Sequence, residues 1–363
     1  MLDNHVPPLK ILIIGPAWVG DMVMAQSLFI YLKQHYPDCI IDVLAPQWSL
    51  PLLALMPEVQ QAYVMPLGHG KLGLSERIKL GKSLRPKQYD WSITLPNSWK
   101  SALVPWAAKI KKRTGYKGEM RYGLLNDIYI LNKQQLTMTV QRFVALADQN
   151  PSITKKFAKK TSQKRPIKQK HQYIALADCL QPRLAIDKNL AKKQVKHYGL
   201  CTEKPILALC AGAEYGAAKC WPAEHYAQLA HHFLHKNWQI VLLGSEKDHT
   251  ICESIYTQIN HPACINLAGK TTLQDAILIL SQAQQVVSND SGLMHIAAAV
   301  NRPVVAIYGS SDPKFTPPLH PKANIAYLDL ACSPCFKREC PLGHLDCLNK
   351  LAPTQIINMI DTP

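Results

Sequence analysis

The sequence lacks the long apolar run that a membrane-spanning helix requires. Such a helix needs about 18 consecutive apolar residues, and no stretch approaches that length. The N-terminal stretch MLDNHVPPLKILIIG holds an apolar run of only four residues, Ile11–Ile14, which is too short for the core of a signal peptide. These absences predict a cytoplasmic protein that can still rest on a membrane surface.

Acidic residues are scarce relative to basic ones. The 363 residues include 25 Asp and Glu against 41 Lys and Arg, a formal net charge of +16 with neutral histidines. This excess indicates an anionic partner: nucleic acid, a phosphorylated substrate or an acidic membrane surface. With 47% hydrophobic and 18% charged residues, the composition is that of a globular chain, and the length suits two domains.

Common nucleotide-binding signatures are missing from the first strand–helix connection. The apolar run Lys10–Ile14 predicts a buried strand, and Met22–Tyr36 has helical periodicity. The loop between them, Gly15–Asp21, is neither GxGxxG nor a Walker loop, which argues weakly against a dinucleotide fingerprint. With a second strand at Ile40–Leu44, this is the first unit of a doubly wound sheet.

Asp21 stands where that loop becomes the helix. Asp is a common N-cap, which is the simpler role. It is also a carboxylate at the carboxyl edge of a parallel sheet, kept ionised by the helix N-terminus and able to accept a proton. Both roles remain open on the local sequence.

Basic residues gather in two further parts of the first half. Lys111–Tyr122 interleaves basic and aromatic residues, which is typical either of a clamp for an acidic ligand or of a solvated loop. The candidates for acceptor contacts in this half are Lys100, Arg113 and Arg121. Pro151–Lys170 carries eight Lys or Arg and no acidic residue, which predicts an interdomain linker or a membrane-attracted segment. We therefore predict a first domain at 1–170, a second at 171–348, and a C-terminal helix in 349–363 that packs back on the first domain.

The second half repeats the strand–loop–helix pattern. Polar loops at 211–219, 244–248, 269–272 and 288–295 each follow an apolar strand, so we expect them along one edge of one parallel sheet. Lys219 stands near a helix N-terminus, where it would suit a phosphate. In Val286–Pro313, a β-branched strand leads through Asp290, Ser291 and Gly292 into an apolar helix.

That turn predicts a phosphate or sugar-phosphate site. Backbone N–H groups at a helix N-terminus have no intrahelical partner and favour anions. His295, one turn into the helix, would point at the same ligand. The alternative is a capping Asp290 or Ser291 and a core histidine.

The densest cysteine cluster comprises Cys332, Cys335, Cys340 and Cys347, with His344 among them. The first pair has the CxxC spacing of a zinc knuckle, but the later spacings fit no common zinc pattern. Reduced thiols in a compact loop are the favoured interpretation for a cytoplasmic chain, and a structural zinc or a disulfide is the alternative.

Several longer stretches resemble one family. They are GPAWVGDMVMAQSL at 15–28, MPLGHG at 65–70, RTGYKGEMRYGLLND at 113–127, GAEYGAAKCWP at 212–222, SNDSGLMHIAAAV at 288–300 and CSPCFKRECPLGH at 332–344. Over nearly its whole length the chain resembles the lipopolysaccharide heptosyltransferases, inverting glycosyltransferases of the GT-B type. It departs from the family at Cys210-Ala211, where a proline is usual.

The resemblance implies an α/β fold of the GT-B type, two Rossmann-like doubly wound domains facing across a cleft. The first domain would bind an acceptor of the heptosyl-Kdo2-lipid A type, and the second would bind ADP-L-glycero-D-manno-heptose. Heptose would pass to the first heptose of the lipopolysaccharide inner core, with Asp21 as the general base. The family's donor-binding residues correspond here to Lys219, Glu246, Asp290, Ser291, Gly292 and His295.

No DxD motif stands at a suitable strand end, so we expect no metal or other cofactor, and ADP-heptose as donor substrate. The positive charge suits an anionic acceptor at the inner face of the cytoplasmic membrane. The alternatives are a family member with a different acceptor, or a basic nucleic-acid-binding protein. No RNA-binding signature or helix-turn-helix pattern supports the latter, so no nucleic-acid partner is expected.

Overall fold

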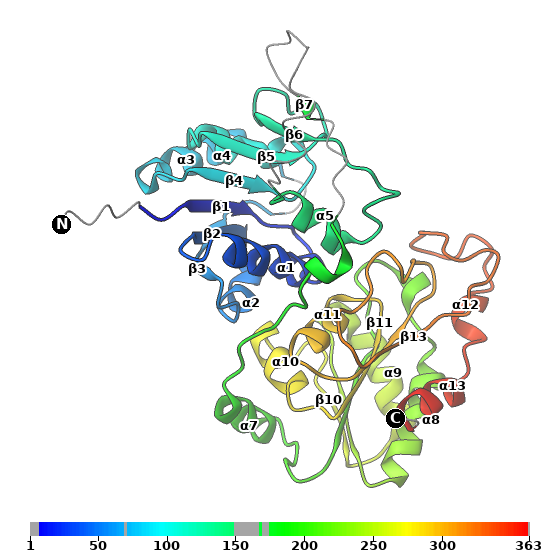
Figure 1. Cartoon of the computed structure of the whole chain (residues 1–363). Helices are drawn as coiled ribbons and strands as arrows, with labels where there is room; N and C mark the ends of the chain where they lie inside the picture. Colours follow the sequence, from blue (N-terminus) through cyan, green and yellow to red (C-terminus); the bar gives the residue numbers. More distant parts are fainter. Residues whose placement is uncertain (1–6, 69–70, 149–166, 169–173, 362–363) are drawn as a thin grey trace. The chain divides into compact units, whose positions relative to one another are not determined.

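The computed structural model describes residues 7–68, 71–148, 167–168 and 174–361. The chain forms two compact units, Met1–Leu180 and Gln181–Pro363, drawn in Figure 1. The predicted domain boundary at residue 170 falls shortly before this division. The basic segment Pro151–Lys170 lies outside the described residues except for 167–168, and so do His69 and Gly70 of the MPLGHG motif.

The first unit is a parallel sheet of seven strands with helices between them, in the order β3-β2-β1-β4-β5-β6-β7. Its elements are β1 (Lys10–Ile14), α1 (Val19–His35), β2 (Ile40–Pro46), α2 (Leu50–Leu53), β3 (Val59–Met65), α3 (Leu74–Ser83), β4 (Trp91–Thr94), α4 (Leu103–Ala107), β5 (Lys112–Tyr116), β6 (Asp127–Tyr129), α5 (Thr139–Ala145) and β7 (Ile167–Lys168).

Strand β1 lies inside this sheet because its apolar residues point to both faces. Leu12 and Ile14 pack in a core with Leu84 and Val104, from the side of α3 and α4. Helix α1 packs against α5 instead. The strand order reverses between β1 and β4, so the loops after these two strands open the crevice where doubly wound sheets bind ligands.

The segment Lys111–Tyr122 is not the loop that its basic composition predicted. Its first part forms β5, where Thr114, Gly115 and Tyr116 are buried and pair with β4 and β6. Lys112 lies over the ring of Trp91, with 4.0 Å from Nζ to the ring centroid. The sequence KRTGY of β5 contains neither an apolar run nor an apolar alternation, so only the pairing with β4 and β6 reveals it as a strand.

The second unit is a parallel sheet of six strands, in the order β10-β9-β8-β11-β12-β13. Its elements are α7 (Lys188–His197), β8 (Ile206–Cys210), α8 (Ala223–His235), β9 (Gln239–Leu242), α9 (His249–Ile259), β10 (Cys264–Asn266), α10 (Leu273–Leu280), β11 (Gln285–Asn289), α11 (Gly292–Ala299), β12 (Val304–Ile307), β13 (Ala323–Ala326), α12 (Asp346–Asn349) and α13 (Pro353–Asp361).

This order is that of a Rossmann sheet, and the switch point lies between β8 and β11. Two doubly wound α/β units are present, as the sequence predicted. Helix α13 packs against α8, β12 and β13 of its own unit. No helix within the described ranges has both the length and the apolarity to cross a bilayer.

Candidate active site

The switch point of the second sheet brings Lys219 and Asp290 together. Lys219 ends the loop after β8, and Asp290 directly follows β11. Their Nζ and Oδ2 atoms are 2.5 Å apart, and the side chains are only 15% and 6% exposed. Removing one partner of an ion pair this shielded from water destabilises the fold, because the other charge stays buried without compensation.

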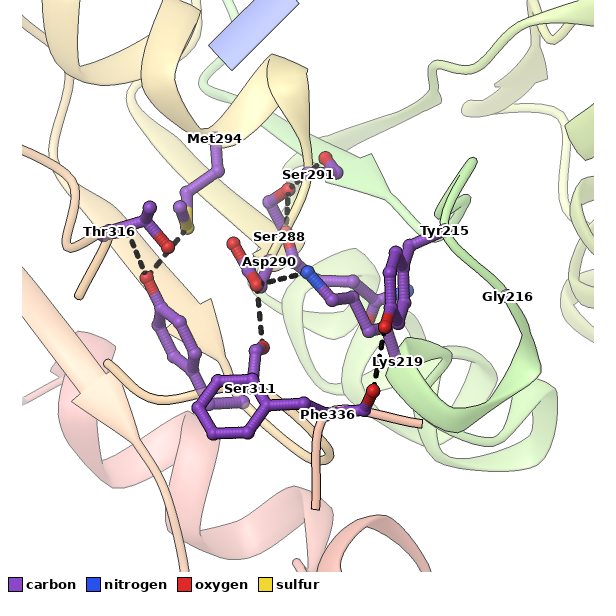
Figure 2. Close-up of polar contacts among 12 residues, drawn as sticks. Tyr215, Gly216, Lys219, Ser288, Asp290, Ser291, Met294, Ser311, Thr316 and Phe336 are labelled. Carbon is purple, nitrogen blue, oxygen red and sulfur yellow. Dashed lines mark hydrogen bonds and ion pairs between the residues drawn. The ribbon is translucent and has the colours of Figure 1, made fainter. Parts of the chain in front are cut away.

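Ser311 is the third member of this group. Its Oγ donates a hydrogen bond to the same Oδ2 atom of Asp290 at 2.5 Å, and Figure 2 shows Asp290 between Ser311 and Lys219. Ser311 comes from the loop after β12, the strand next to β11. We did not predict it, although it follows a strand at the same sheet edge.

The loop that carries Lys219 is fixed by a buried asparagine at the end of β11. Asn289 Nδ2 donates to the carbonyl oxygen of Ala211 at 2.5 Å, and its Oδ1 accepts bonds from the Trp221 backbone N–H and the Tyr226 hydroxyl. All hydrogen-bonding atoms of this amide side chain therefore hold the β8 loop and α8 against β11. The sequence pattern marked Asn289 only as part of a turn.

The cysteine-rich segment closes over the same loop. The Tyr215 hydroxyl donates to the carbonyl oxygen of Phe336 at 2.7 Å, and the Phe336 N–H donates to the carbonyl of Ser310. Gly216 has φ of 149°, and a Cβ there would lie 2.4 Å from the carbonyl oxygen of Arg338. Glycine is thus required for this close approach. The contacts join the loops of Lys219 and Ser311.

Tyr215 also faces the Lys219 ammonium, which lies 4.9 Å from its ring centroid. The guanidinium of Arg338 lies 5.6 Å from the same ring. An aromatic ring face attracts cations, so Tyr215 holds the charged groups of Lys219 and Arg338 close to its ring. We did not predict Tyr215, although it lies in the loop 211–219, because an aromatic ring gave no sign of a phosphate contact, and Arg338 lies in the cysteine-rich segment, far from any predicted strand.

The four cysteines of this segment, Cys332, Cys335, Cys340 and Cys347, are free thiols. Within the described part of the chain, no group of three His, Cys, Asp or Glu residues could hold a metal ion. Burial raises the pKa of the Cys347 thiol, and the other three thiols raise it further. The contacts of this segment with the site include those of the Phe336 backbone and the Arg338 guanidinium.

The N-terminus of α11 offers the anion-binding groups that the sequence predicted. Ser291 is its N-cap in an extended conformation and makes no side-chain capping bond to the helix. Its Oγ lies 3.2 Å from that of Ser288. The first N–H groups of the helix, from Gly292 onward, have no intrahelical acceptor, which suits a diphosphate.

His295 is buried one turn into α11, with 5% of its surface exposed. Burial lowers its pKa from 6.5 to about 4, with Asp290 opposing this shift and Lys219 adding to it. The imidazole is therefore neutral near pH 7 and has one ring N–H to donate. His295 is thus a core histidine, and its contact with a ligand stays a prediction.

The His295 pKa predicts acid sensitivity of the fold. Between pH 6.5 and about 4, His295 is protonated in the unfolded chain but stays neutral in the folded chain. The free energy of unfolding therefore falls as the pH drops through that window. Changing His295→Asn should remove this loss, and the Tm decrease between pH 7 and pH 5 should shrink by several degrees. Thermal melts check this, with exposed His231→Asn as the control that keeps the wild-type slope. Equal slopes in all three proteins would contradict the prediction.

The β9 loop separates two neighbouring acidic residues. Asp248 Oδ2 accepts bonds from both the N–H and the hydroxyl of Ser245, each at 2.8 Å. Glu246 is exposed and lies against Gly269, whose added Cβ would be 2.2 Å from Glu246 Oε2. Asp248 thus shapes its own turn, and the exposed Glu246 stays a predicted donor-binding residue. Thr272 caps α10.

Asp21 lies in the first turn of α1 and is partly exposed. The N-cap of that helix is Trp18, so Asp21 does not occupy the N-cap position itself. Helix α1 follows β1, so Asp21 lies near the carboxyl end of β1, at the switch point of the first sheet. Lys100 follows β4 at the same edge, and its Nζ donates to the carbonyl of Lys71 at 3.3 Å.

The two predicted acceptor arginines have structural bonds. Arg121 is 2% exposed, and its guanidinium donates to the carbonyls of Pro96 and Tyr116 at 2.6 and 2.5 Å. Burial lowers its pKa to about 10. Arg121 therefore joins two loops, which corrects its predicted role as an acceptor ligand. Partly exposed Arg113 donates to the carbonyls of Leu124 and Ile110.

Comparison with known proteins decides the family. The model of glycosyltransferase family 9 (heptosyltransferase) matches residues 77–346. The chain belongs to glycosyltransferase family 9. It is 44% identical to lipopolysaccharide heptosyltransferase 2 of Escherichia coli K12, over 97% of this chain and 98% of that protein. It is 48% identical to lipooligosaccharide heptosyltransferase 2 of Haemophilus influenzae, over 88% and 89% of the two chains.

A solved structure also matches the fold. The E. coli ADP-heptose LPS heptosyltransferase II superposes with a TM-score of 0.80 at 41% identity, covering 97% of this chain and 98% of that one. This confirms the predicted GT-B fold class. The family match spans Lys219, Glu246, Asp290 and Ser311.

Proposed function

We propose that this family 9 chain transfers heptose from ADP-heptose to the first heptose of the lipopolysaccharide inner core. The observation that carries the proposal is the identity of 44% to a heptosyltransferase 2 over 97% of the chain. The shielded Lys219–Asp290 pair beside the N-terminus of α11 supports it, because a cation and free N–H groups suit a nucleotide diphosphate.

In the proposed reaction, Asp21 accepts the proton of the acceptor hydroxyl as its oxygen attacks the anomeric carbon of heptose. The bond from that carbon to the diphosphate oxygen breaks, and ADP leaves with the electron pair. Attack opposite the leaving group inverts the anomeric centre. Lys219 and the α11 N–H groups stabilise the charge that develops on ADP.

We further propose that the donor changes the partners of Lys219. In the structure its Nζ bonds Asp290. With a diphosphate bound, the ammonium is shared with phosphate oxygens, and Asp290 turns a lone pair to a heptose hydroxyl. Neutral His295 donates to the same ligand, and Glu246 meets the nucleoside. No cofactor is required in this scheme, and the chain works as a peripheral protein at the cytoplasmic face of the membrane.

The direct test is incubation with ADP-heptose and a set of truncated cores of defined structure, with product mass as the readout. We expect a gain of one heptose on cores that end in the first heptose. A gain only on heptose-free cores, or only on longer cores, would assign a different acceptor within the family. Retention on DNA without turnover would support the nucleic-acid alternative.

Replacing Ser311 tests the support of Asp290. A hydrogen bond to a charged group contributes about 1.5–3 kcal/mol, so Ser311→Ala should raise the KM for ADP-heptose by about tenfold or more. The value of kcat should change less, because the general base is untouched. Ser311→Thr keeps the hydroxyl and should restore most of the affinity. An unaltered KM in the alanine variant would mean that Lys219 alone fixes Asp290.

A further inference from the structure

Large apolar side chains remain exposed along one edge of the first unit. Leu72 and Leu74 follow β3, whereas Met120 and Tyr122 follow β5. Met120 is 88% exposed, and the other three are between 43% and 49%. Because all strands of this sheet are parallel, their carboxyl ends lie at one edge. Several such residues at one edge differ from the single exposed leucines that any surface carries.

Hydrogen bonds join these residues into one surface. We call residues 71–74, 97–100 and 117–122 the edge loops. Lys100 Nζ bonds the carbonyl of Lys71 at 3.3 Å, and the Trp99 N–H bonds Glu119 Oε2 at 3.0 Å. The loop 97–100 therefore contacts both 71–74 and 117–122, and so connects the loops that follow β3 and β5 across the strands between them.

Two buried arginines hold the apolar tips outward. Arg77 is 6% exposed, and it donates to the carbonyls of Leu72 and Lys71 at 2.7 and 3.3 Å. Arg121 fixes the third edge loop in the same way, through the carbonyls of Pro96 and Tyr116. Burying a guanidinium is costly. The two arginines therefore fix the backbones of these loops, in which Leu72 and Met120 are exposed.

The charges among these residues are mainly positive. Lys71 and Lys117 are exposed, and Lys100 is partly exposed. The one acidic side chain of the edge loops, Glu119, accepts the Trp99 N–H. Aliphatic and aromatic tips between lysines suit the boundary of an anionic bilayer, where the tips enter the acyl region and ammonium groups meet phosphates.

We propose that the edge loops seat the first unit on an anionic bilayer, with Leu72, Leu74, Met120 and Tyr122 entering the lipid interface. This inference rests on the proposed function, because a lipid-linked acceptor has to be met at a membrane. Asp21 follows β1 at the same sheet edge. The general base thus faces the side from which the bilayer presents the acceptor hydroxyl.

The test uses flotation of the full-length chain with vesicles of phosphatidylethanolamine containing phosphatidylglycerol. The apolar variant combines Leu72→Ser with Met120→Ser, and its matched control is Leu190→Ser on α7 of the second unit, where Leu190 is 40% exposed. We expect about tenfold or more weaker vesicle binding in the edge-loop variant and no change in the control. Thermal melts of both variants establish that they are folded.

A second pair of variants tests the charges. Lys71→Gln with Lys117→Gln should weaken binding by about fivefold per lysine, and only on vesicles that contain the anionic lipid. Lys192→Gln with Lys193→Gln on exposed positions of α7 is the control. The proposal would be overturned if the wild type bound anionic vesicles no better than purely zwitterionic vesicles. It would also be overturned if the edge-loop and α7 variants lost equal affinity for anionic vesicles.

A transfer assay without a membrane tests the proposed function separately from the membrane surface. Transfer from ADP-heptose to a delipidated, water-soluble core oligosaccharide should be unchanged in the edge-loop variants, because no bilayer is needed. Vesicle binding without any transfer to that acceptor by the wild type would reject the proposed function alone. Transfer by the wild type with unaltered vesicle binding in the edge-loop variants would reject the membrane surface alone.

Discussion

Asp21→Asn should abolish heptose transfer while leaving ADP binding nearly intact. The substitution keeps the size and polarity of the side chain but removes the basic carboxylate, and a positioned general base contributes about 10²–10⁴-fold in rate. We therefore expect kcat to fall by at least about a hundredfold. Product mass and ADP release measure the rate, and calorimetry with ADP measures binding.

A matched control is available at the other end of the same helix. Asp38 is exposed just beyond the C-terminus of α1, so Asp38→Asn makes the same chemical change away from the sheet edge. It should leave kcat within about twofold, as an ordinary surface substitution does. If Asp21→Asn turned over as fast as this control, another group would have to be the base.

Lys219→Met should cause the second large loss, this time in donor binding. The methionine keeps the aliphatic stem and removes the ammonium, and truncating one member of a buried charged pair costs about 2–5 kcal/mol. The KM for ADP-heptose should rise by about a hundredfold, with a further fall in kcat because the leaving diphosphate loses its cation. Steady-state kinetics with varied donor measure both terms.

The ion pair requires a second variant to separate chemistry from folding. With Lys219 gone, the Asp290 carboxylate stays 6% exposed without its cation, which destabilises the fold. In the double variant Lys219→Met with Asp290→Asn, that charge is absent, so the Tm should recover while donor affinity stays low. Recovery of both would mean that Lys219 serves only the fold.

The strands of the two sheets could largely be predicted because buried parallel strands are short apolar runs. β1, β8 and β11 follow from this pattern, and so do the loops that carry Asp21, Lys219 and Asp290. Helix α9 was missed, although Cys252, Ile255 and Ile259 give it a buried face at helical spacing. β13 was missed because its central residues Asn324 and Ile325 are exposed.

Residue type was a poorer guide to role than position in the sheet. Arg121 matched a pattern of interleaved basic and aromatic residues, yet its guanidinium is used by backbone carbonyls that no sequence pattern reveals. Ser311 has no local sequence signal of a role, and the adjacency of β11 and β12 brings it to Asp290. Contacts between distant strand ends depend on strand order, which a single sequence does not contain.

The pairing of Lys219 with Asp290 has a consequence for selectivity. In the resting protein the ammonium is already neutralised by a carboxylate of the same sheet, so inorganic phosphate gains little by competing for it. A nucleotide that carries a sugar brings hydroxyl groups for the displaced carboxylate, whereas free ADP leaves that oxygen without a replacement. If Lys219 and Asp290 have the proposed roles, we expect the resting enzyme to bind inorganic phosphate and free ADP more weakly than ADP-heptose.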